Sequence, residues 1–395
     1  MKILQIVKRV VVRLTKTFFR LFCYVVPVND KAIVFMAFHG RGYLDNPKAI
    51  YEEMKMDLQF TNYKFYWVLR DKNDVPDGAI AIKYMSISYF FVFARSKYWI
   101  INCKLPQYII KKRDQIYLQT WHGTPLKRLG HDIQTTSDTK FYRSGLNAEQ
   151  MKKTYDDDVS KYDYMLSPNR FCTKVFPSAF HIEKEKLVEI GYPRNDILNN
   201  PNTNKIHDIK LRLHLPDRKK IVLYAPTWRD NSYIAQGYTF QLKADFENWK
   251  KILGDNYIIL FKPHYLIVNS YERYKIEGLG DFLYYIDANY DINDLYLISD
   301  ILITDYSSVF FDYAILERPI YFFMYDREEY QDQLRGFYLN IDTELPGKVY
   351  SNENKMLLDI KKEKFDYKKL SEFNKEFNSF QDGNCARKVI QHVFR

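Results

Sequence analysis

Short apolar runs, rich in β-branched and aromatic residues, alternate with stretches of helical periodicity along most of this 395-residue chain. Runs of this length are typical of strands buried in parallel sheets, and the helical stretches between them are typical of crossover connections. We expect a first series of strands at 32–38, 64–69, 79–84, 98–102, 115–120, 162–166 and 187–190, and a second series at 220–224, 257–261, 283–286, 301–304 and 320–323. Two such series predict an α/β fold with two Rossmann-like halves.

A polar stretch at 199–208, which holds several Asn residues and a Pro, separates the two series of strands. Such a composition favours a linker. A chain of 395 residues is also long for one core and fits two domains of common size. Because ligands of open parallel sheets bind at the loops that follow the strands' carboxyl ends, we look for functional residues in those loops.

The chain has a formal net charge of +10 at pH 7, which predicts anionic partners: nucleic acid, acidic lipid or phosphate-bearing substrates. Its four cysteines lie far apart, with neither a C-x-x-C pair nor a histidine cluster at zinc spacing. This pattern favours a reducing compartment and predicts neither a disulfide framework nor a structural metal site. The sequence also lacks the G-x-x-x-x-G-K-[ST], G-x-G-x-x-G and G-x-S-x-G motifs, which argues against a P-loop ATPase, a dinucleotide dehydrogenase and an α/β-hydrolase.

Residues 1–29 contain no acidic residue and predict an amphipathic helix. On a helical wheel of about 100° per residue, one face collects Ile3, Val7, Val10, Leu14, Phe18 and Leu21, and the roughly opposite face collects Lys2, Arg9, Arg13, Lys16 and Arg20. Basic residues interrupt every apolar run, which fits a spanning helix or a signal peptide poorly. We expect an in-plane helix on an anionic membrane surface, with the five cations toward the headgroups. The alternative is a basic helix that packs on its own domain.

A histidine follows the predicted strand at 115–120, within the segment TWHGTPLK (120–127). At a strand end and before a glycine, an imidazole can stand in a cleft beside exposed amide groups. The ordinary histidine pKa of about 6.5 suits His122 to accept a proton near neutrality. The alternative is a structural histidine next to an ordinary Gly-Thr-Pro turn.

Two more clusters leave strands of the second series: YAPTWRD (224–230) and FKPH (261–264). Arg229 can pair with phosphate oxygens through its planar guanidinium group. The alternative is a strand exit with an aromatic anchor and a solvated Arg–Asp pair. Lys262 and His264 place a cation and an imidazole at the end of the next strand, where a proline stiffens the backbone.

The last cluster, TDYSSV (304–309), ends a buried strand and begins a helical pattern at 310–316. A strand that ends in Thr-Asp-x-Ser-Ser makes a hydroxyl-rich turn whose free amide groups lie at a helix N-terminus. Such a terminus favours an anion, because the unpaired N–H groups and the helix dipole both point toward it. The alternative is plain N-capping by Ser307 or Ser308, which uses the same groups.

Taken in order, these segments resemble the CDP-glycerol glycerophosphotransferases of teichoic acid and capsule synthesis. The resemblance rests on TWHGTPLKRLG (120–130), GYPRND (191–196), YAPTWRD (224–230), FKPH (261–264), TDYSSVFFDYAIL (304–316), RPIYFF (318–323), RGFY (335–338) and the QDGNCAR segment within 377–387. It spans about residues 30–390, and the ordered set is far more specific than any single segment.

The resemblance implies a GT-B architecture, in which two Rossmann-like domains face each other across a cleft. The expected domains are an acceptor domain at 30–200, a CDP-polyol donor domain at 201–370, and a C-terminal helix within 371–395 that returns to the first domain. It also implies a monotopic enzyme at the cytoplasmic face of the bacterial membrane, in agreement with the helix predicted at 1–29. Family members with a long additional N-terminal region act as polymerases, so its absence here favours a priming or short-transfer role without excluding polymerisation.

The activity implied by the resemblance is transfer of glycerol phosphate or ribitol phosphate from CDP-glycerol or CDP-ribitol to a polyprenyl-pyrophosphate-linked saccharide, with release of CMP. His122 is expected to be the general base and His264 the second catalytic residue. The donor is expected to contact Thr227, Arg229, Lys262, Thr304, Asp305, Ser307, Ser308 and Asp312, and the acceptor Gly123, Thr124, Lys127 and Arg128. Within these sets, Asp305 is expected to orient His264 or the polyol hydroxyls, and Asp312 to hold ribose or polyol. No tightly bound cofactor is implied, although Mg²⁺ carried by the donor pyrophosphate would leave no motif.

Two other classes of function stay open. A GT-B glycosyltransferase that uses a nucleotide sugar would share the fold, and the HGTP and TDYSS segments argue against it. A basic, non-catalytic protein that binds nucleic acid or a lipid surface would fit the charge, but no recognition-helix, RRM or zinc-finger pattern supports it, so we expect no nucleic-acid partner. The choice of polyol, the acceptor, the number of units added and the oligomeric state are left open.

Overall fold

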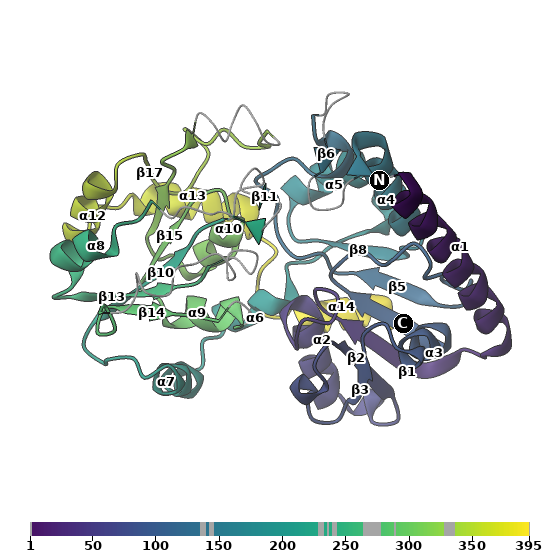
Figure 1. The fold of residues 1–395 in the computed structure, drawn as a ribbon. Coiled ribbons are helices and arrows are strands. Elements are labelled where there is room, and N and C mark those ends of the chain that lie inside the picture. The colour runs from purple at the N-terminus through teal and green to yellow at the C-terminus, as the bar shows by residue number, and fades with distance from the viewer. Residues whose placement is uncertain are drawn as a thin grey trace.

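The computed structural model describes residues 2–134, 140–141, 146–227, 233–234, 237–238, 243–263, 278–287, 290–327 and 336–394. Two parallel sheets lie side by side, each with helices on both faces (Figure 1). The strand orders are β3-β2-β1-β4-β5-β8-β9 and β14-β13-β10-β15-β16-β17. Both sheets follow the order of a doubly wound nucleotide-binding fold, so the predicted α/β class with two Rossmann-like domains is confirmed.

The first sheet forms a core between two sets of helices. Its strands are β1 (Asn29–Met36), β2 (Lys64–Leu69), β3 (Ile80–Lys83), β4 (Ser96–Ile101), β5 (Ile116–Gln119), β8 (Tyr164–Ser167) and β9 (Leu187–Glu189). One face is covered by α1 (Lys2–Val25), α3 (Ile87–Arg95), α4 (Ala148–Val159) and α5 (Arg170–Phe180), and the other by α2 (Asp45–Met56) and α14 (Cys385–Val393). Because both faces are buried, these strands are continuously apolar rather than alternating.

The second sheet has the same construction. Its strands are β10 (Lys220–Ala225), β13 (Tyr257–Phe261), β14 (Leu283–Tyr285), β15 (Ile301–Thr304), β16 (Ile320–Phe323) and β17 (Val349–Tyr350). One face packs against α7 (Thr203–Arg212), α9 (Ile292–Ile298), α10 (Val309–Tyr313) and α13 (Tyr367–Phe377), and the other against α8 (Phe246–Leu253) and α12 (Glu353–Lys361). Side-chain oxygens cap several of these helices, as Asp245 does by accepting from the backbone N–H of Asn248 in α8.

Some elements depart from the prediction. The stretch predicted as a linker, 199–208, is mostly helical: α6 (Asp196–Asn199) ends at its first residue and α7 begins at Thr203, with Asn202 as its N-cap. The Asn-rich composition that suggested a linker therefore reflects helix capping. The short strand β17 and the two-residue pairs β6 (Lys140–Phe141) with β7 (Leu146–Asn147) and β11 (Tyr233–Ile234) with β12 (Gly237–Tyr238) were not predicted, because two residues give no periodic signal.

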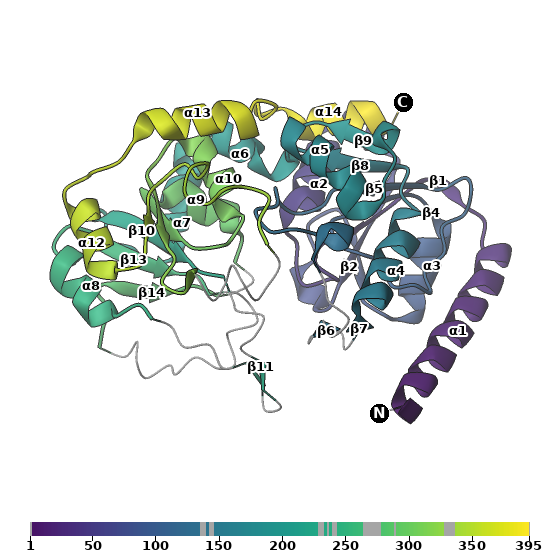
Figure 2. The same cartoon turned by 90° about the horizontal axis from the view of Figure 1, so that it is seen from above.

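The C-terminal segment crosses from one domain to the other. Helix α13 packs on the core of the second domain, and α14 packs on the sheet of the first (Figure 2). Asp196 fixes the crossing, because its carboxylate accepts from the backbone N–H groups of Cys385 and Ala386 at 2.9 and 2.8 Å, at the start of α14. A Cβ on Gly191 would lie 2.8 Å from Cys385 Sγ and 3.0 Å from the backbone oxygen of Phe380, so the crossing segment packs closely against this glycine.

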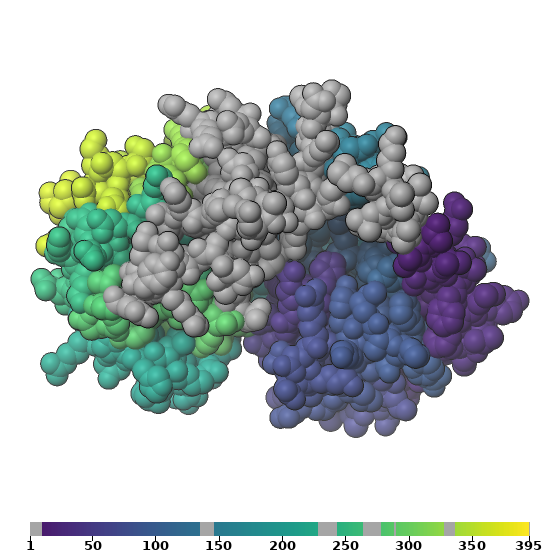
Figure 3. Space-filling model, viewed as in Figure 1, coloured from purple at the N-terminus to yellow at the C-terminus, as the bar shows by residue number. Residues whose placement is uncertain are grey.

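Helix α1 lies along the outer flank of the first domain (Figures 1 and 3). It docks through Phe19, which is fully buried, and through Phe22, whose ring contacts Phe91 of α3. The helix ends before Pro27, as expected where proline disfavours the helical conformation of the preceding residue. Within the described part of the chain, no helix combines the length and apolarity that a membrane crossing requires.

Candidate active site

His122 stands at the carboxyl end of β5 and is oriented by residues that follow β1 and β4. Its Nδ1 lies 2.7 Å from the backbone oxygen of Asn102, the residue that follows β4. Trp121 stacks on the imidazole at a centroid distance of 4.3 Å, and Phe38 meets it edge-on at 5.7 Å. Because a carbonyl oxygen only accepts hydrogen bonds, Nδ1 carries the proton in the neutral ring and Nε2 carries the lone pair.

The backbone around this imidazole is held in unusual conformations. Phe38, His39 and Trp121 have φ angles of 45°, 58° and 52°, in the left-handed region that costs an L-residue about 1–2 kcal/mol. Hydrogen bonds hold the backbone there: the backbone N–H of Phe38 donates to Asn102 Oδ1 at 2.8 Å, and that of Trp121 donates to Gln119 Oε1 at 3.0 Å. Burial lowers the pKa of His122, so the ring stays neutral to a lower pH than an exposed histidine.

In the second domain, the ends of β10 and β15 are tied together by side chains. The Asp305 carboxylate accepts from the backbone N–H groups of Thr227 and Tyr306 at 2.8 and 2.6 Å. The Thr304 hydroxyl donates to the backbone oxygen of Ala225 at 2.8 Å. Thr304 and Asp305 are almost fully buried, so the structure gives both of them a part in shaping the loops at this sheet edge.

The two sheet edges meet at Gly123 and Ser308. A Cβ on Gly123 would lie 3.0 Å from Ser308 Oγ, so the loop after β5 and the turn between β15 and α10 are in direct contact across the domain boundary. Ser308 is the N-cap residue of α10, and its side chain makes no capping hydrogen bond to that helix. The structure therefore brings the residue after His122 against the hydroxyl-rich turn that the sequence singled out.

Arg194 links the two domains beside this contact. Its Nη1 bonds Asp45 of the first domain and its Nη2 bonds Asp312 of α10, each at 2.6 Å, and all three side chains are no more than 7% exposed. Although burial opposes it, the carboxylates of Asp312 and Asp45 raise the pKa of Arg194 above its ordinary value. Asn195 Nδ2 donates to the other Asp312 oxygen at 2.8 Å.

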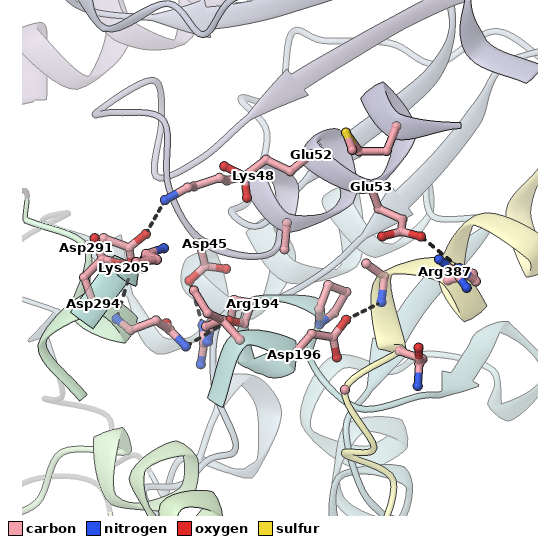
Figure 4. Close-up of a pocket in the computed structure, with 18 residues that line it drawn as sticks. Asp45, Lys48, Glu52, Glu53, Arg194, Asp196, Lys205, Asp291, Asp294 and Arg387 are labelled. Carbon is pink, nitrogen blue, oxygen red and sulfur yellow. Dashed lines mark hydrogen bonds and ion pairs between the residues drawn. The ribbon is translucent and has the colours of Figure 1, made fainter. Parts of the chain in front are cut away.

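Figure 4 shows a cavity of about 300 Å³ at the same contact between the domains, where it opens between α2, α6, α9 and the start of α14. Lys48 reaches across to Asp291 at 2.7 Å, and Arg387 of α14 pairs with Glu53 of α2 at 2.9 Å. Charged side chains that line the cavity thus form ion pairs with one another. We therefore interpret the cavity as part of the contact between the domains.

Lys262 lies at the end of β13, where its Nζ donates to the backbone oxygen of Asp287 at 3.0 Å. Burial lowers the pKa of Lys262 to about 8. Its ammonium group is therefore charged at neutral pH and loses its proton in mildly alkaline solution.

A short antiparallel contact joins the acceptor-side loop to the second domain. Lys127 pairs with Phe337 as an isolated β-bridge, and the backbone N–H of Arg128 donates to the backbone oxygen of Gly336 at 3.1 Å. The Tyr338 hydroxyl donates to the Asp132 carboxylate at 2.6 Å. Residues 336–338, the described part of the RGFY segment, thus hold the loop that begins at His122, while the side chains of Lys127 and Arg128 remain partly exposed.

Two expected contact residues have other partners. Thr124, expected at the acceptor, is 3% exposed and accepts a hydrogen bond from Asn169 Nδ2 at 3.1 Å. Asp312, expected at ribose or polyol, has both oxygens bound by Arg194 and Asn195. Because their polar atoms already serve the packing of the loop and of the domain boundary, we leave both out of the proposed substrate contacts.

Arg229 and His264 lie outside the described residues, so their predicted roles stay predictions. Asn46 was not among the predicted site residues, yet its Nδ2 donates to the backbone oxygen of Trp121 at 3.2 Å and its Oδ1 accepts from the N–H of Arg194 at 3.1 Å. No role was predicted for Arg194 either, although the GYPRND segment contains this residue. That segment was the available signal for Arg194, whereas nothing in the sequence marks Asn46.

The chain matches the model of the family described as CDP-glycerol:poly(glycerophosphate) glycerophosphotransferase over residues 17–395. It is 41% identical over 364 residues to a teichoic acid poly(glycerol phosphate) polymerase of Staphylococcus epidermidis, covering 91% of this chain and 49% of that protein. It is 38% identical over 400 residues to a polymerase of the same description from Bacillus spizizenii, covering 99% of both. The chain thus spans about half the length of the first relative and nearly all of the second.

Among solved structures, the wall teichoic acid polymerase TagF superposes with a TM-score of 0.87 at 38% identity, covering 100% of this chain and 96% of that one. A second TagF structure, of a histidine variant soaked with CDPG, has the same TM-score at 37% identity. The two-domain GT-B arrangement is therefore shared with TagF. With its family model and its fold both matched along the chain, the protein belongs to the CDP-glycerol:poly(glycerophosphate) glycerophosphotransferase family.

Proposed function

We propose that this protein transfers glycerol phosphate, or ribitol phosphate, from a CDP-polyol to a hydroxyl group of a lipid-linked teichoic acid or capsule acceptor and releases CMP. The observation that carries the proposal is the contact between Gly123 and Ser308. It joins the loop of a partly buried imidazole to a hydroxyl-rich turn at a helix start, which are the two parts that a phosphoryl transfer between domains needs. The names of the glycerol-phosphate and ribitol-phosphate relatives support the substrate class.

In the proposed reaction, His122 is the general base. The acceptor O–H gives its proton to Nε2, the oxygen attacks the phosphorus that bears the polyol, and the bond from that phosphorus to the bridging oxygen of CMP breaks. CMP leaves with the bond's electron pair. The hydrogen bond from Nδ1 to Asn102 supports this role, because it fixes the tautomer whose lone pair is on Nε2.

Charge on the transferring phosphoryl group would be stabilised from the second domain. We assign this stabilisation to the hydroxyl and amide groups of Ser307 and Ser308 and to the ammonium group of Lys262, together with Arg229 and His264. Thr227, Thr304 and Asp305 would act by shaping the loops, as their hydrogen bonds to the ends of β10 and β15 suggest. Mg²⁺ carried by the donor pyrophosphate would partly neutralise the same negative charge without requiring ligands from the protein.

On the acceptor side, Gly123 would let the acceptor hydroxyl approach His122, and Lys127 and Arg128 would meet the acceptor's own phosphates. Both cations follow His122 on the same loop and keep partly exposed side chains. A polyprenyl-pyrophosphate-linked saccharide is the acceptor that we propose. Its anionic groups match the cations, and its lipid requires the cleft to stand near a membrane.

We also propose that α1 binds the cytoplasmic face of an anionic membrane as a peripheral, monotopic contact. Its described residues form three faces: a buried face at Phe19, a basic face at Arg13 and Arg20, and an uncovered apolar face. On that last face Val10, Leu14, Phe18 and Leu21 are 50–67% exposed. Such a surface fits an interfacial helix rather than one that only packs on its own domain.

One cation of the basic face already forms an ion pair within the protein. Lys16 pairs with Asp157 of α4 at 3.8 Å, which ties it to the protein as well as to any headgroup. Lys2 and Arg9 belong to α1, and their side chains are not among those that the structure describes.

Sedimentation with anionic vesicles tests the role of α1. The Phe18→Asp variant should sediment less with the vesicles, whereas the Leu211→Asp variant, changed at an equally exposed apolar residue on α7, should bind them as the parent protein does. Equal binding by the two variants would refute the α1 assignment.

The main experiment measures CMP release from CDP-glycerol and from CDP-ribitol, each with and without a lipid pyrophosphate acceptor. We expect acceptor-dependent CMP release with at least one of the two donors. A panel of nucleotide sugars tests the glycosyltransferase alternative in the same assay. Sugar transfer without any CMP release from a CDP-polyol would overturn the proposal.

A further inference from the structure

A cluster of two imidazoles and one carboxylate lies where three elements of the first domain meet, apart from the proposed active site. His131 belongs to η3 (Gly130–Asp132), Asp156 to α4, and His181 is the C-cap residue of α5. Among the residues that the structure describes, this is the one group of three metal-binding side chains whose ligand atoms all lie within 4.8 Å of one another.

Both imidazoles converge on the same carboxylate oxygen. His131 Nε2 lies 2.7 Å from Asp156 Oδ1, and His181 Nδ1 lies 3.2 Å from that same atom. The two rings stack with their centroids 3.4 Å apart and their planes 21° from parallel. The nitrogen that each ring turns toward Asp156 is one of the two atoms through which an imidazole binds a metal.

We propose that His131, Asp156 and His181 bind one divalent transition-metal ion of the zinc class. Two imidazole nitrogens and one carboxylate oxygen are ligands that Zn²⁺ prefers, with a fourth position open to water. Neighbouring ligands of a tetrahedral zinc ion with arms of about 2.0–2.1 Å lie roughly 3.4 Å apart. The observed separations of 2.7 and 3.2 Å are shorter than this, so the Asp156 side chain, which is 48% exposed, would move outward. Because a metal lies near the plane of each imidazole that binds it, the stacked rings would also turn apart, and the His181 side chain, which is 58% exposed, has room to turn.

The backbone that carries these ligands is already fixed. A Cβ on Gly130 would lie 1.9 Å from the backbone oxygen of Ala179, so η3 is packed directly against the end of α5. His181 has a φ of 55°, the left-handed conformation that ends this helix. Because the three ligand positions are held before any ion arrives, binding would not have to order a loop.

The ion would have a structural role next to the acceptor-side loop. Asp132, the residue after His131, accepts hydrogen bonds from Ser178 of α5 and from Tyr338 of the second domain. A metal at the cluster would add a cross-link between η3, α4 and α5 at the place where this loop is anchored. The site and its test are independent of the proposed transfer reaction.

The test titrates untagged, full-length protein with Zn²⁺ by calorimetry and with Co²⁺ by visible absorption. Matched variants are His131→Asn, Asp156→Asn and His181→Asn, since asparagine tolerates the left-handed conformation at the last position. The control is His207→Asn, an exposed histidine on α7 outside the cluster. Circular dichroism and thermal melting establish that each variant is folded.

We expect one equivalent of Zn²⁺ per parent chain and a Co²⁺ spectrum of tetrahedral type. Each cluster variant should bind Zn²⁺ at least about tenfold more weakly, the effect that even the loss of an outer-shell partner produces. The His207→Asn control should bind as the parent does. Absence of binding by the parent, or unchanged binding by a folded His181→Asn or His131→Asn variant, would overturn the proposal.

Discussion

The two sheets have the same strand order, yet their facing edges are built differently. At the first, three residues other than glycine, Phe38, His39 and Trp121, have left-handed backbone conformations around one imidazole. At the second, the described ends of β10 and β15 show no such conformation, and the side chains of Asp305 and Thr304 join their backbones. Side-chain hydrogen bonds hold both edges, but the first uses them to fix a strained backbone around a ring, whereas the described part of the second uses them to join unstrained strand ends.

This difference follows from the proposed tasks of the two edges. A base must present one nitrogen lone pair in one direction, so a strained backbone that is held by its hydrogen bonds is useful there. An anion site needs several donors around a group of oxygens, which relaxed loops and a helix start can supply. Substitutions at the two edges should therefore change different kinetic constants.

The largest effect is expected from His122→Ala. Loss of the general base should lower the rate of CMP release by about 10²–10⁴-fold. Binding of CDP-glycerol, measured by calorimetry, should stay close to that of the parent, because the donor is assigned to the other edge. His207→Ala on α7 is the control. Turnover like that of the parent would remove His122 from the base role.

Arg194→Met tests the link between the edges. It leaves Asp45 and Asp312 buried without their cation, which typically costs about 3–5 kcal/mol. Urea unfolding should show this as a large fall in the midpoint. Lys220→Met, which breaks an exposed pair with Glu363, should change the stability by about 1 kcal/mol or less. Equal midpoints for the two variants would mean that Arg194 does not stabilise the contact between the domains.

Replacement of Ser307 and Ser308 by alanine together tests the donor edge. Each hydroxyl bonded to a charged oxygen contributes about 1.5–3 kcal/mol, so the loss of both should lower the affinity for CDP-glycerol by about a hundredfold or more. The rate at saturating donor should fall less. Ser351→Ala, at an exposed serine of the same domain, is the control. Unchanged donor affinity in the double variant would count against the phosphate site.

The smallest effect is expected in the pH profile of kcat/KM. The rate should fall on the acid side through a pH below about 6.5, because burial lowers the pKa of His122 and the protonated ring cannot act as a base. It should fall again as the pH rises through about 8, where Lys262 loses its charge. Lys262→Met should remove the alkaline limb and keep the acid one. If the alkaline limb survives the Lys262→Met substitution, a group other than Lys262 is responsible for it.

Much of the fold was predictable, because buried parallel strands have a strong local signal. The predicted limits of β2, β13, β15 and β16 match the structure, since each is a short apolar run between polar residues. The stretch at 199–208 misled because asparagine is common both in linkers and at helix caps. Its identity as the start of α7 depends on packing against α9, which no local pattern records.

The site was predictable where residue type and strand end coincide. His122 and Ser308 were singled out for that reason, and the structure brings their loops together. The partners of His122 were not predictable, because a backbone oxygen at Asn102 holds the ring and any residue supplies such an oxygen. The partners of Asp312 were missed because Arg194 lies 118 residues away in the sequence.

The polypeptide passes between the domains twice, along α6 and at 378–384, and the two passages run side by side. Asn199 and Asn200 donate to the backbone oxygens of Gln381 and Gly383, each at 3.1 Å. A single connector would let one half swivel in any direction, whereas two adjacent connectors restrict it to rotation about one axis. Exchange of spent nucleotide for fresh substrate should therefore proceed by a one-dimensional opening, and a protease cut in either passage alone should leave the halves attached.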